Sequence, residues 1–286
     1  MAGSLIVSVR EWLRRAKLYP TRPVRIGIAL GGGFARGIAH IGVLKALERA
    51  AIPLHAIAGV SAGSIVAALY ASGLTPAEIE RAAAVMRFAD IGRWTISKQG
   101  LALTDRMEKF LSRLLKVTRF EQMRIPLAIV ASDLISGTPA IFKDQGDVIL
   151  PVRASCAYPG LFAPVRNNGC CLVDGMITMD VPARPLRDMG CTHVISVALP
   201  DAADCTDPGN LFGVVTRSFQ VLNSRTQADW RRFTDVVVAP DVSRSSWDSF
   251  RQCAELIAAG ERAGQAAIPQ MLRWLGGIAP SSAAVA

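Results

Sequence analysis

The feature that most constrains the fold of this chain is a unit that occurs twice near the N-terminus. Each unit is an apolar run, then a turn of small residues, then an amphipathic helical pattern. The runs are 24–30 (VRIGIAL) and 54–60 (LHAIAGV), and helices are expected at about 37–51 and 62–72. This order favours parallel strands joined by right-handed crossovers, which predicts an α/β fold with a mostly parallel sheet.

The rest of the chain continues this alternation, without a linker that would separate two domains. We therefore expect one domain over 23–276, a basic amphipathic helix within 1–22 and a flexible tail over 277–286. Further helices are expected at 76–86, 104–116, 210–232 and 249–275, and further strands at 126–132, 139–143, 147–150, 170–174, 193–199 and 235–239.

Composition excludes several classes of protein. Hydrophobic residues make up 51% of the 286 residues and charged residues 19%, which is enough apolar material for a full core and excludes intrinsic disorder. The net charge is +9, of which the first 25 residues carry +5, so the remainder gives little support to nucleic acid as a partner. The basic N-terminal segment is compatible with a helix docked on the domain and with peripheral contact to a membrane surface.

Two features bear on the cellular compartment. The six cysteines form no CxxC pair and no secretory signal opens the chain, so we expect reduced thiols in the cytoplasm. Residues 56–74 form an uncharged run of nineteen residues, which is long enough for a membrane span. Because this run is rich in Ala, Gly and Ser and poor in Leu and Phe, a buried strand, turn and helix is favoured.

The first motif that carries chemistry is a G-x-S-x-G, Gly59-Val60-Ser61-Ala62-Gly63, at the junction of an expected strand and helix. In that context the glycines allow a sharp turn with strained backbone angles, which presents the serine hydroxyl at the end of the strand. Backbone N–H groups at the start of the helix can support negative charge. Ser61 is therefore a candidate nucleophile, although the motif alone also occurs where small residues pack tightly.

The second motif is the glycine-rich loop over 31–37 (GGGFARG). A dinucleotide fingerprint is disfavoured because Phe34 occupies the second glycine position and no acidic residue ends the next strand. A Walker A loop is excluded because Ile38 follows Gly37, where that motif needs Lys. The third interpretation is an oxyanion hole, in which backbone N–H groups point at developing negative charge. If the first two strands are neighbours, this loop lies near Ser61.

A serine nucleophile needs a base within hydrogen-bond reach. His40 lies one turn past the glycine loop, whereas His55 and His193 lie at the starts of their strands, away from Ser61. Asp174 ends the expected strand 170–174, and α/β folds build their sites at such strand ends. Partial burial would raise the pKa of this carboxyl and improve it as a base, although Asp-Gly also marks plain turns.

Three blocks in this order carry a resemblance to a known family. They are LGGGFARGIAHIGVLKALE (30–48), GVSAGS (59–64) and VDG (173–175), and ASCAYPGLFAPV (154–165) resembles the family's stretch before the aspartate. On these blocks the chain resembles bacterial patatin-like phospholipases of the group related to neuropathy target esterase. The resemblance runs from about residue 24 to the C-terminal helices.

The resemblance implies a three-layer patatin-like fold, with helices on both faces of the sheet, and a Ser–Asp dyad instead of a triad. It implies Ser61 as nucleophile and Asp174 as its base. It also implies an oxyanion hole from the N–H groups of Gly32, Gly33 and Phe34, support of the loop or of a lipid phosphate by Arg36 and Gly37, and an elbow shaped by Gly59 and Gly63. Two departures are Phe34, where the family usually has Gly, and 176–180 (MITMD), where it often has Gly and paired Asn.

The implied activity is hydrolysis of an ester bond in a phospholipid or lysophospholipid, without a cofactor or metal. Acyl transfer to another alcohol, as by a lysophospholipid acyltransferase, and non-catalytic lipid binding are the alternatives. The stretch over 94–103 is expected to form an apolar lip over the site. The basic helix within 1–22 would hold the protein at the inner membrane face, and the sequence does not indicate an oligomeric state.

Overall fold

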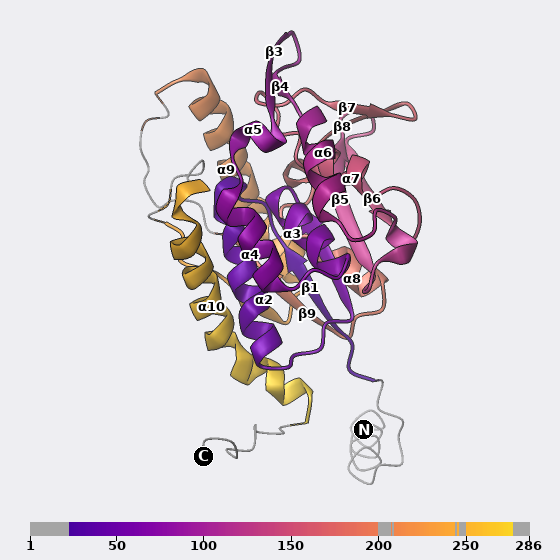
Figure 1. Cartoon of the computed structure of the whole chain (residues 1–286), viewed down its shortest axis with the longest axis vertical. Helices are drawn as coiled ribbons and strands as arrows, with labels where there is room; N and C mark the ends of the chain where they lie inside the picture. The colour runs from indigo at the N-terminus through magenta and orange to yellow at the C-terminus, as the bar shows by residue number, and fades with distance from the viewer. Residues whose placement is uncertain (1–22, 200–206, 208, 244, 246–249, 277–286) are drawn as a thin grey trace, which may run out of the picture.

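A computed structural model describes residues 23–199, 207, 209–243, 245 and 250–276 (Figure 1). The predicted basic helix within 1–22 and the tail over 277–286 lie outside these residues. The centre is a sheet in the order β10-β9-β1-β2-β5-β8-β7, with β6 paired to β5. Its strands are β1 (Ile26–Leu30), β2 (Ala56–Val60), β5 (Leu127–Asp133), β6 (Thr138–Lys143), β7 (Val165–Asn167), β8 (Cys170–Asp174), β9 (His193–Val197) and β10 (Val236–Val238).

The predicted parallel pairing is confirmed for the centre of the sheet. β10, β9, β1, β2 and β5 run parallel in consecutive pairs, whereas β6 and β8 are both antiparallel to β5 and β7 is antiparallel to β8. Because parallel strands start and end at the same edges, the loops after β1 and β2 lie beside each other.

Helices cover both faces of the sheet, which confirms the three-layer arrangement. The larger hydrophobic cluster packs one face against α2 (Ala39–Arg49), α3 (Ala62–Ala71), α4 (Pro76–Val85), α6 (Asp105–Leu114), α7 (Ile149–Ser155) and α10 (Cys253–Trp274). The opposite face carries α8 (Ala183–Asp188) and the end of α9 (Leu211–Arg231), where Trp230 packs. Short 3-10 helices are η1 (Phe34–Ile38), η2 (Phe120–Gln122), η3 (Gly175–Ile177) and η4 (Phe250–Gln252).

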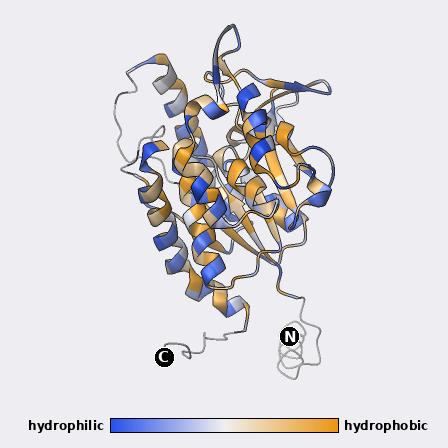
Figure 2. Cartoon of the chain, viewed as in Figure 1, coloured by the Kyte–Doolittle hydropathy of each residue, from blue (hydrophilic) through white to orange (hydrophobic). Residues whose placement is uncertain are grey.

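The two faces of the sheet differ in side-chain size. Successive residues of a strand point to opposite faces. In β1, Ile26, Ile28 and Leu30 belong to the larger cluster, whereas Ala29 belongs to the smaller one. The same alternation recurs in β2 and β5, where alanines point to the face that carries α8. Because these side chains are small, α8 can approach this face of the sheet closely. Figure 2 shows hydrophobic colouring along the strands and mixed colouring around the helices.

The predicted strand over 147–150 is wrong, because Ile149–Ser155 is the helix α7. Pro151 stands in the first turn of that helix, where a missing N–H breaks no intrahelical hydrogen bond. The sequence also did not reveal α5 (Phe88–Ile91), α8, β7 or the antiparallel hairpin of β3 (Arg93–Ser97) and β4 (Gly100–Leu103). Within the described part of the chain, no helix is both long and apolar enough to cross a membrane.

Candidate active site

Ser61 stands at a sharp turn between β2 and α3, as the G-x-S-x-G motif predicts. Its backbone has φ +52° and ψ −127°, which is rare for a residue with a side chain and is found at over-determined functional positions. The flanking glycines are required by close packing: a Cβ at Gly59 would lie 2.5 Å from Ser64 Cα, and one at Gly63 would overlap the carbonyl of Leu30. The turn is thus pressed against the end of β1.

A residue that sequence reasoning missed braces this turn. The N–H of Ser61 donates to the Ser155 hydroxyl at 2.8 Å, and this hydroxyl donates to the carbonyl of Val130 at 2.6 Å. Ser155 is fully buried at the end of α7. Its only signal in the sequence is its place in the ASCAYPG stretch before the aspartate.

Asp174 ends β8 and is fully buried. Ala131 and Asp174 are paired in the sheet, and β5 also pairs with β2, which leads into Ser61. The Met176 N–H donates to Asp174 Oδ1 at 3.0 Å, while Oδ2 completes no hydrogen bond of good geometry to the described residues. The β8 strand therefore brings this carboxylate to the same edge of the sheet as the serine turn.

Burial raises the pKa of the Asp174 carboxyl to about 7, because the charged form loses its hydration. A hydrogen bond from the Ser61 side chain and the one from Met176 oppose this shift, and the charge of Asp180 adds to it. The Ser61 contact is a loose one, as catalytic hydrogen bonds often are before substrate binds. A carboxylate with a pKa near neutrality is a better proton acceptor than an ordinary aspartate.

The glycine loop lies against the serine turn. A Cβ placed on Gly32 would lie 3.6 Å from Ser61 Cβ and 3.7 Å from Asp180 Oδ1. The Gly32 N–H donates to the carbonyl of Asp180 at 3.3 Å, whereas the Gly33 N–H forms no hydrogen bond to any residue the structure describes. Of these two amides, Gly33 is therefore the one available to a ligand.

Phe34, where the family usually has Gly, adopts φ +50°. This left-handed conformation is the one that glycine favours, so the phenylalanine retains the path of a glycine loop at a cost in backbone strain. Its ring packs edge-on against Tyr158, with ring centroids 4.8 Å apart. Arg36 follows in η1 and is buried, and Gly37 contacts Ala62, the first residue of α3.

The three histidines are engaged elsewhere. His55 Nδ1 accepts the N–H of Ile26 at the start of β1, and His193 stacks on Trp274 at the start of β9. His40 is buried in α2, where its Nε2 lies 2.9 Å from the carbonyl oxygen of Gly31 and burial lowers its pKa to about 4. Of the histidines and Asp174, Asp174 is thus the one whose side chain interacts with that of Ser61 in the described part of the chain.

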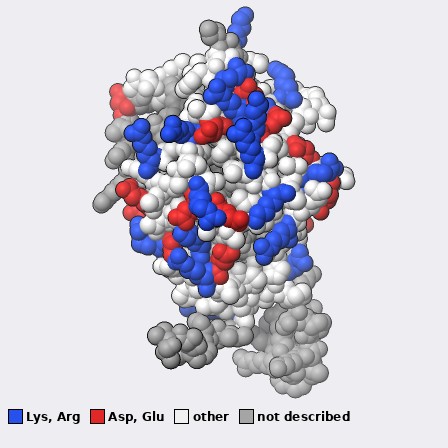
Figure 3. All heavy atoms as spheres, viewed as in Figure 1, with Lys and Arg blue, Asp and Glu red and all other residues white. Residues whose placement is uncertain are grey.

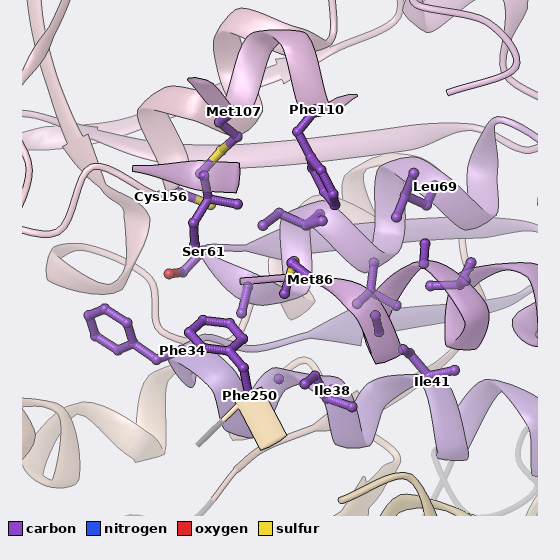
Figure 4. Close-up of a pocket in the computed structure, with 18 of the residues that line it drawn as sticks. Phe34, Ile38, Ile41, Ser61, Leu69, Met86, Met107, Phe110, Cys156 and Phe250 are labelled. Carbon is purple, nitrogen blue, oxygen red and sulfur yellow. The ribbon is translucent and has the colours of Figure 1, made fainter. Parts of the chain in front are cut away.

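Ser61 lies at one end of an almost wholly apolar cavity (Figure 4). Phe34 and Cys156 lie near the serine, and Ile41 and Leu69 line the opposite end. The wall comes from α2, α3, α4 and α6 together with Phe162 and Phe250, so the cavity lies among the helices of the larger helical layer. The arrangement suits a hydrocarbon chain whose reactive end reaches Ser61.

A second, more polar cavity also begins at Ser61 and Phe34. The glycine loop, Arg36 and Asp180 line it on one side, and polar residues of α9 such as Asn223 line it on the other. Ser61 and Phe34 are therefore shared by an apolar and a polar cavity.

Among the described residues, no three His, Cys, Asp or Glu side chains gather closely enough to hold a metal ion.

Together, the sheet, the strained serine turn and the adjacent glycine loop define a patatin-like α/β protein. Residues 28–187 match the family model of patatin-like phospholipases, and the chain belongs to this family. The chain is 32% identical over 180 residues to an uncharacterised NTE family protein of Mycobacterium tuberculosis, which is 61% of this chain and 49% of that protein. It thus spans about half the length of that relative.

Two further similarities extend along more of the chain. Lysophospholipase NTE1 of Candida albicans is 29% identical over 230 residues, which cover 78% of this chain and 16% of that protein. The crystal structure of VipD from Legionella pneumophila superposes with a TM-score of 0.50 and 14% identity, covering 87% of this chain and 67% of VipD. The likeness to VipD concerns the fold.

Proposed function

We propose that the protein is a serine acyl hydrolase that cleaves an ester bond of a phospholipid or lysophospholipid. The observation that carries this proposal is the placement of Ser61 beside Asp174: a serine on a strained turn faces a buried carboxyl whose pKa is raised to about 7, and the serine side chain interacts with that carboxyl. The apolar cavity that begins at the serine gives the lipid class of substrate. Membership of the patatin-like phospholipase family supports both points.

In the proposed reaction, Ser61 Oγ attacks the ester carbonyl carbon while its proton passes to Asp174. The N–H groups of Gly33 and Phe34 stabilise the tetrahedral oxyanion. The Gly32 N–H also contributes once its 3.3 Å hydrogen bond to the carbonyl of Asp180 breaks. The intermediate collapses, and the leaving alcohol takes the proton from Asp174. Water then attacks the acyl-serine with the same base, which releases the fatty acid and restores Ser61.

The two cavities divide the substrate in this proposal. The acyl chain occupies the apolar cavity, and the alcohol half, with its headgroup, leaves through the polar cavity beside Arg36. This assignment follows from matching apolar to apolar surface, because burying a charged headgroup in the apolar cavity would be costly. Water, or an acceptor alcohol in the case of acyl transfer, would enter along the polar cavity.

The test is turnover of nitrophenyl esters of short and medium chain length by the wild type, Ser61→Ala and Asp174→Asn. Both substitutions should lower kcat by about a thousandfold or more, and labelling by a fluorophosphonate probe should disappear in Ser61→Ala. Matched controls are Ser112→Ala and Asp188→Asn, whose side chains are exposed on α6 and α8. These controls should retain wild-type turnover.

Two outcomes would overturn the proposal. One is a folded wild-type protein that neither turns over esters or lipid micelles nor reacts with the probe, which would leave lipid binding as its function. The other is full activity in Asp174→Asn, which would place the base elsewhere. Trapping of the acyl group by added glycerol or lysolipid would identify acyl transfer.

A further inference from the structure

A row of packed aromatic rings extends from the wall of the apolar cavity to the surface at the β3–β4 hairpin. Phe162 lines the cavity and is buried. Its ring stacks on Phe88 of α5 with centroids 5.9 Å apart, and Phe88 packs on Trp94 of β3 with centroids 5.1 Å apart. Trp94 is 64% exposed, so the row runs from the cavity wall to solvent.

The hairpin that carries Trp94 is fixed to the wall of the cavity. The N–H groups of Leu101 and Ala102 both donate to the carbonyl of Leu161, at 3.0 and 2.8 Å, and the Ala163 N–H donates to the carbonyl of Ala102 at 2.9 Å. The β3–β4 hairpin projects from one end of the molecule, well away from the C-terminal end of α10 (Figure 1). The hairpin is thus an ordered projection anchored beside the cavity.

Large apolar side chains are exposed around this row. Val85 at the end of α4 is 74% exposed and Leu101 on β4 is 53% exposed. A hollow lined by Val85, Phe88 and Arg87 shares Met86 and Phe250 with the apolar cavity, so the two are adjacent. Exposed apolar groups rimmed by polar ones mark interaction sites.

The charges here are mainly basic. The segment over 85–103 holds Arg87, Arg93 and Lys98 against Asp90 alone. Asp90 accepts the N–H of Arg87 as a helix cap, and Arg93 pairs with Asp105, whereas Arg87 and Lys98 form no ion pair with a described residue. Figure 3 shows Lys and Arg side chains numerous over this end of the molecule, with fewer Asp and Glu between them.

We infer that Val85, Arg87, Trp94, Lys98 and Leu101 form a docking surface for a lipid bilayer with anionic headgroups. Trp94 and the two aliphatic side chains enter the boundary between headgroups and acyl chains, where tryptophan is favoured, and the two cations meet the headgroups. A lipid leaving the bilayer then passes along the aromatic row into the apolar cavity. The inference rests on the proposed function, because it assigns the source of that lipid substrate.

The experiment is co-sedimentation of the full chain with vesicles of ether-linked lipids, which contain no ester that an esterase could cleave. One preparation is phosphatidylcholine alone, and the other is equal parts of phosphatidylcholine and phosphatidylglycerol in the same ether-linked form. Trp94→Ser should weaken binding about tenfold on both vesicles. Arg87→Glu and Lys98→Glu should each weaken it about fivefold or more on the anionic vesicles alone.

Matched control variants carry the same changes elsewhere. Ile141→Ser alters an exposed apolar residue on the edge strand β6. Arg273→Glu reverses an exposed charge at the other end of the molecule, on the last turn of α10. Both should bind both kinds of vesicle as the wild type does. Urea unfolding of each variant verifies that the hairpin substitutions leave the fold intact.

Failure of the docking surface is distinguishable from failure of the proposed function. A wild-type protein that does not bind the anionic vesicles would overturn the docking surface. Variants of Arg87, Trp94 and Lys98 that bind these vesicles like the controls would also overturn it, and their retained binding would point to the segment 1–22 as the membrane contact. Vesicle binding that depends on Trp94, in a protein that neither cleaves nitrophenyl esters or lipid micelles nor reacts with the fluorophosphonate probe, would support the docking surface and overturn the hydrolase.

Discussion

The N–H of Ser61 donates a 2.8 Å hydrogen bond to the hydroxyl of Ser155, which in turn donates to the carbonyl of Val130. This chain of two bonds joins the serine turn, α7 and β5. A residue held at φ +52° keeps that conformation only when its neighbours fix it. Ser155 is therefore the side chain that holds the strained turn against the sheet.

Ser155→Ala should lower both stability and turnover. The substitution leaves the Ser61 N–H and the Val130 carbonyl buried without this partner, which costs about 1–3 kcal/mol of unfolding free energy. We expect kcat to fall as well, because the turn can relax toward unstrained angles. Urea unfolding and ester kinetics check this, with Ser112→Ala as the exposed control. Wild-type stability and kcat in Ser155→Ala would show that the turn is held by other contacts.

The pH dependence of kcat/KM should follow the ionisation of Asp174. Only the carboxylate can accept the proton of Ser61, and its pKa is about 7. We expect kcat/KM for a soluble ester to rise about tenfold per pH unit below 7 and to level off above it. An aspartate with an ordinary pKa would instead give a profile that is already flat at pH 5.

The same shift predicts that Asp174→Asn stabilises the protein at alkaline pH. The folded-state pKa lies above the unfolded value, so its contribution to stability is present below pH 4 and is lost as the pH rises through about 7. Asn carries no charge to desolvate. Asp174→Asn should therefore unfold at a higher urea concentration than wild type at pH 8 and at a similar one near pH 4. An equal difference at both pH values would contradict this.

The serine turn and the aspartate were predictable because their signals are local. Gly59, Ser61 and Gly63 stand within five residues at a strand–helix junction, and Asp174 directly ends an apolar run. Ser155 was not predictable, because it acts 94 residues further along the chain than Ser61. The short run before it, over 147–150, shows neither a clear period of 2 nor one of 3.6.

The β3–β4 hairpin was expected only as an apolar lip. Its strands are joined by Lys98 and Gln99, neither of which is among the Asn, Asp and Gly residues that usually reveal a two-residue turn. Its exposed Trp94 and Leu101 also obscure the alternation of a half-buried strand. Only the packing against Phe88 and the backbone of Leu161 indicates how the hairpin relates to the cavity.

Replacing Phe34 should separate backbone strain from the role of its ring. Phe34→Gly and Phe34→Ala both remove the ring that lines the two cavities, but only glycine relieves the φ of +50°. We expect Phe34→Gly to be about 1 kcal/mol more stable than Phe34→Ala in urea unfolding. Both should raise kcat/KM for branched relative to straight-chain acyl esters.

Phe110→Ala is the comparison for the effect on branched acyl chains, because Phe110 lines the apolar cavity and does not line the polar one. Phe110→Ala should raise kcat/KM for longer straight-chain acyl esters. It should not raise kcat/KM for acyl esters that are branched next to the carbonyl. If Phe34→Gly and Phe34→Ala are equally stable, the positive φ of Phe34 costs nothing measurable. If neither changes the preference for branched esters, its ring does not limit the space next to Ser61.

His40 should act as a positioning residue for the glycine loop. A pKa of about 4 keeps the imidazole neutral at neutral pH, so a neutral Nε2–H donates to the carbonyl of Gly31. That bond fixes the peptide that precedes Gly32 and hence the direction of the next amides. His40→Leu should lower kcat about tenfold with KM within twofold, because a misaligned amide weakens transition-state binding alone. His40→Gln retains an N–H donor and should recover most of kcat.

A stability measurement checks that His40 is buried in its neutral form, and the kcat of His40→Gln against that of His40→Leu distinguishes positioning from simple packing. The folded-state pKa of His40 lies below the unfolded value of 6.5, so its contribution to stability is present above about pH 6.5 and is lost as the pH falls toward 4. Because neither Gln nor Leu titrates there, both variants should lose less stability than wild type over that range. If kcat in His40→Gln falls as far as in His40→Leu, the bond to Gly31 does not position the loop and His40 only fills space.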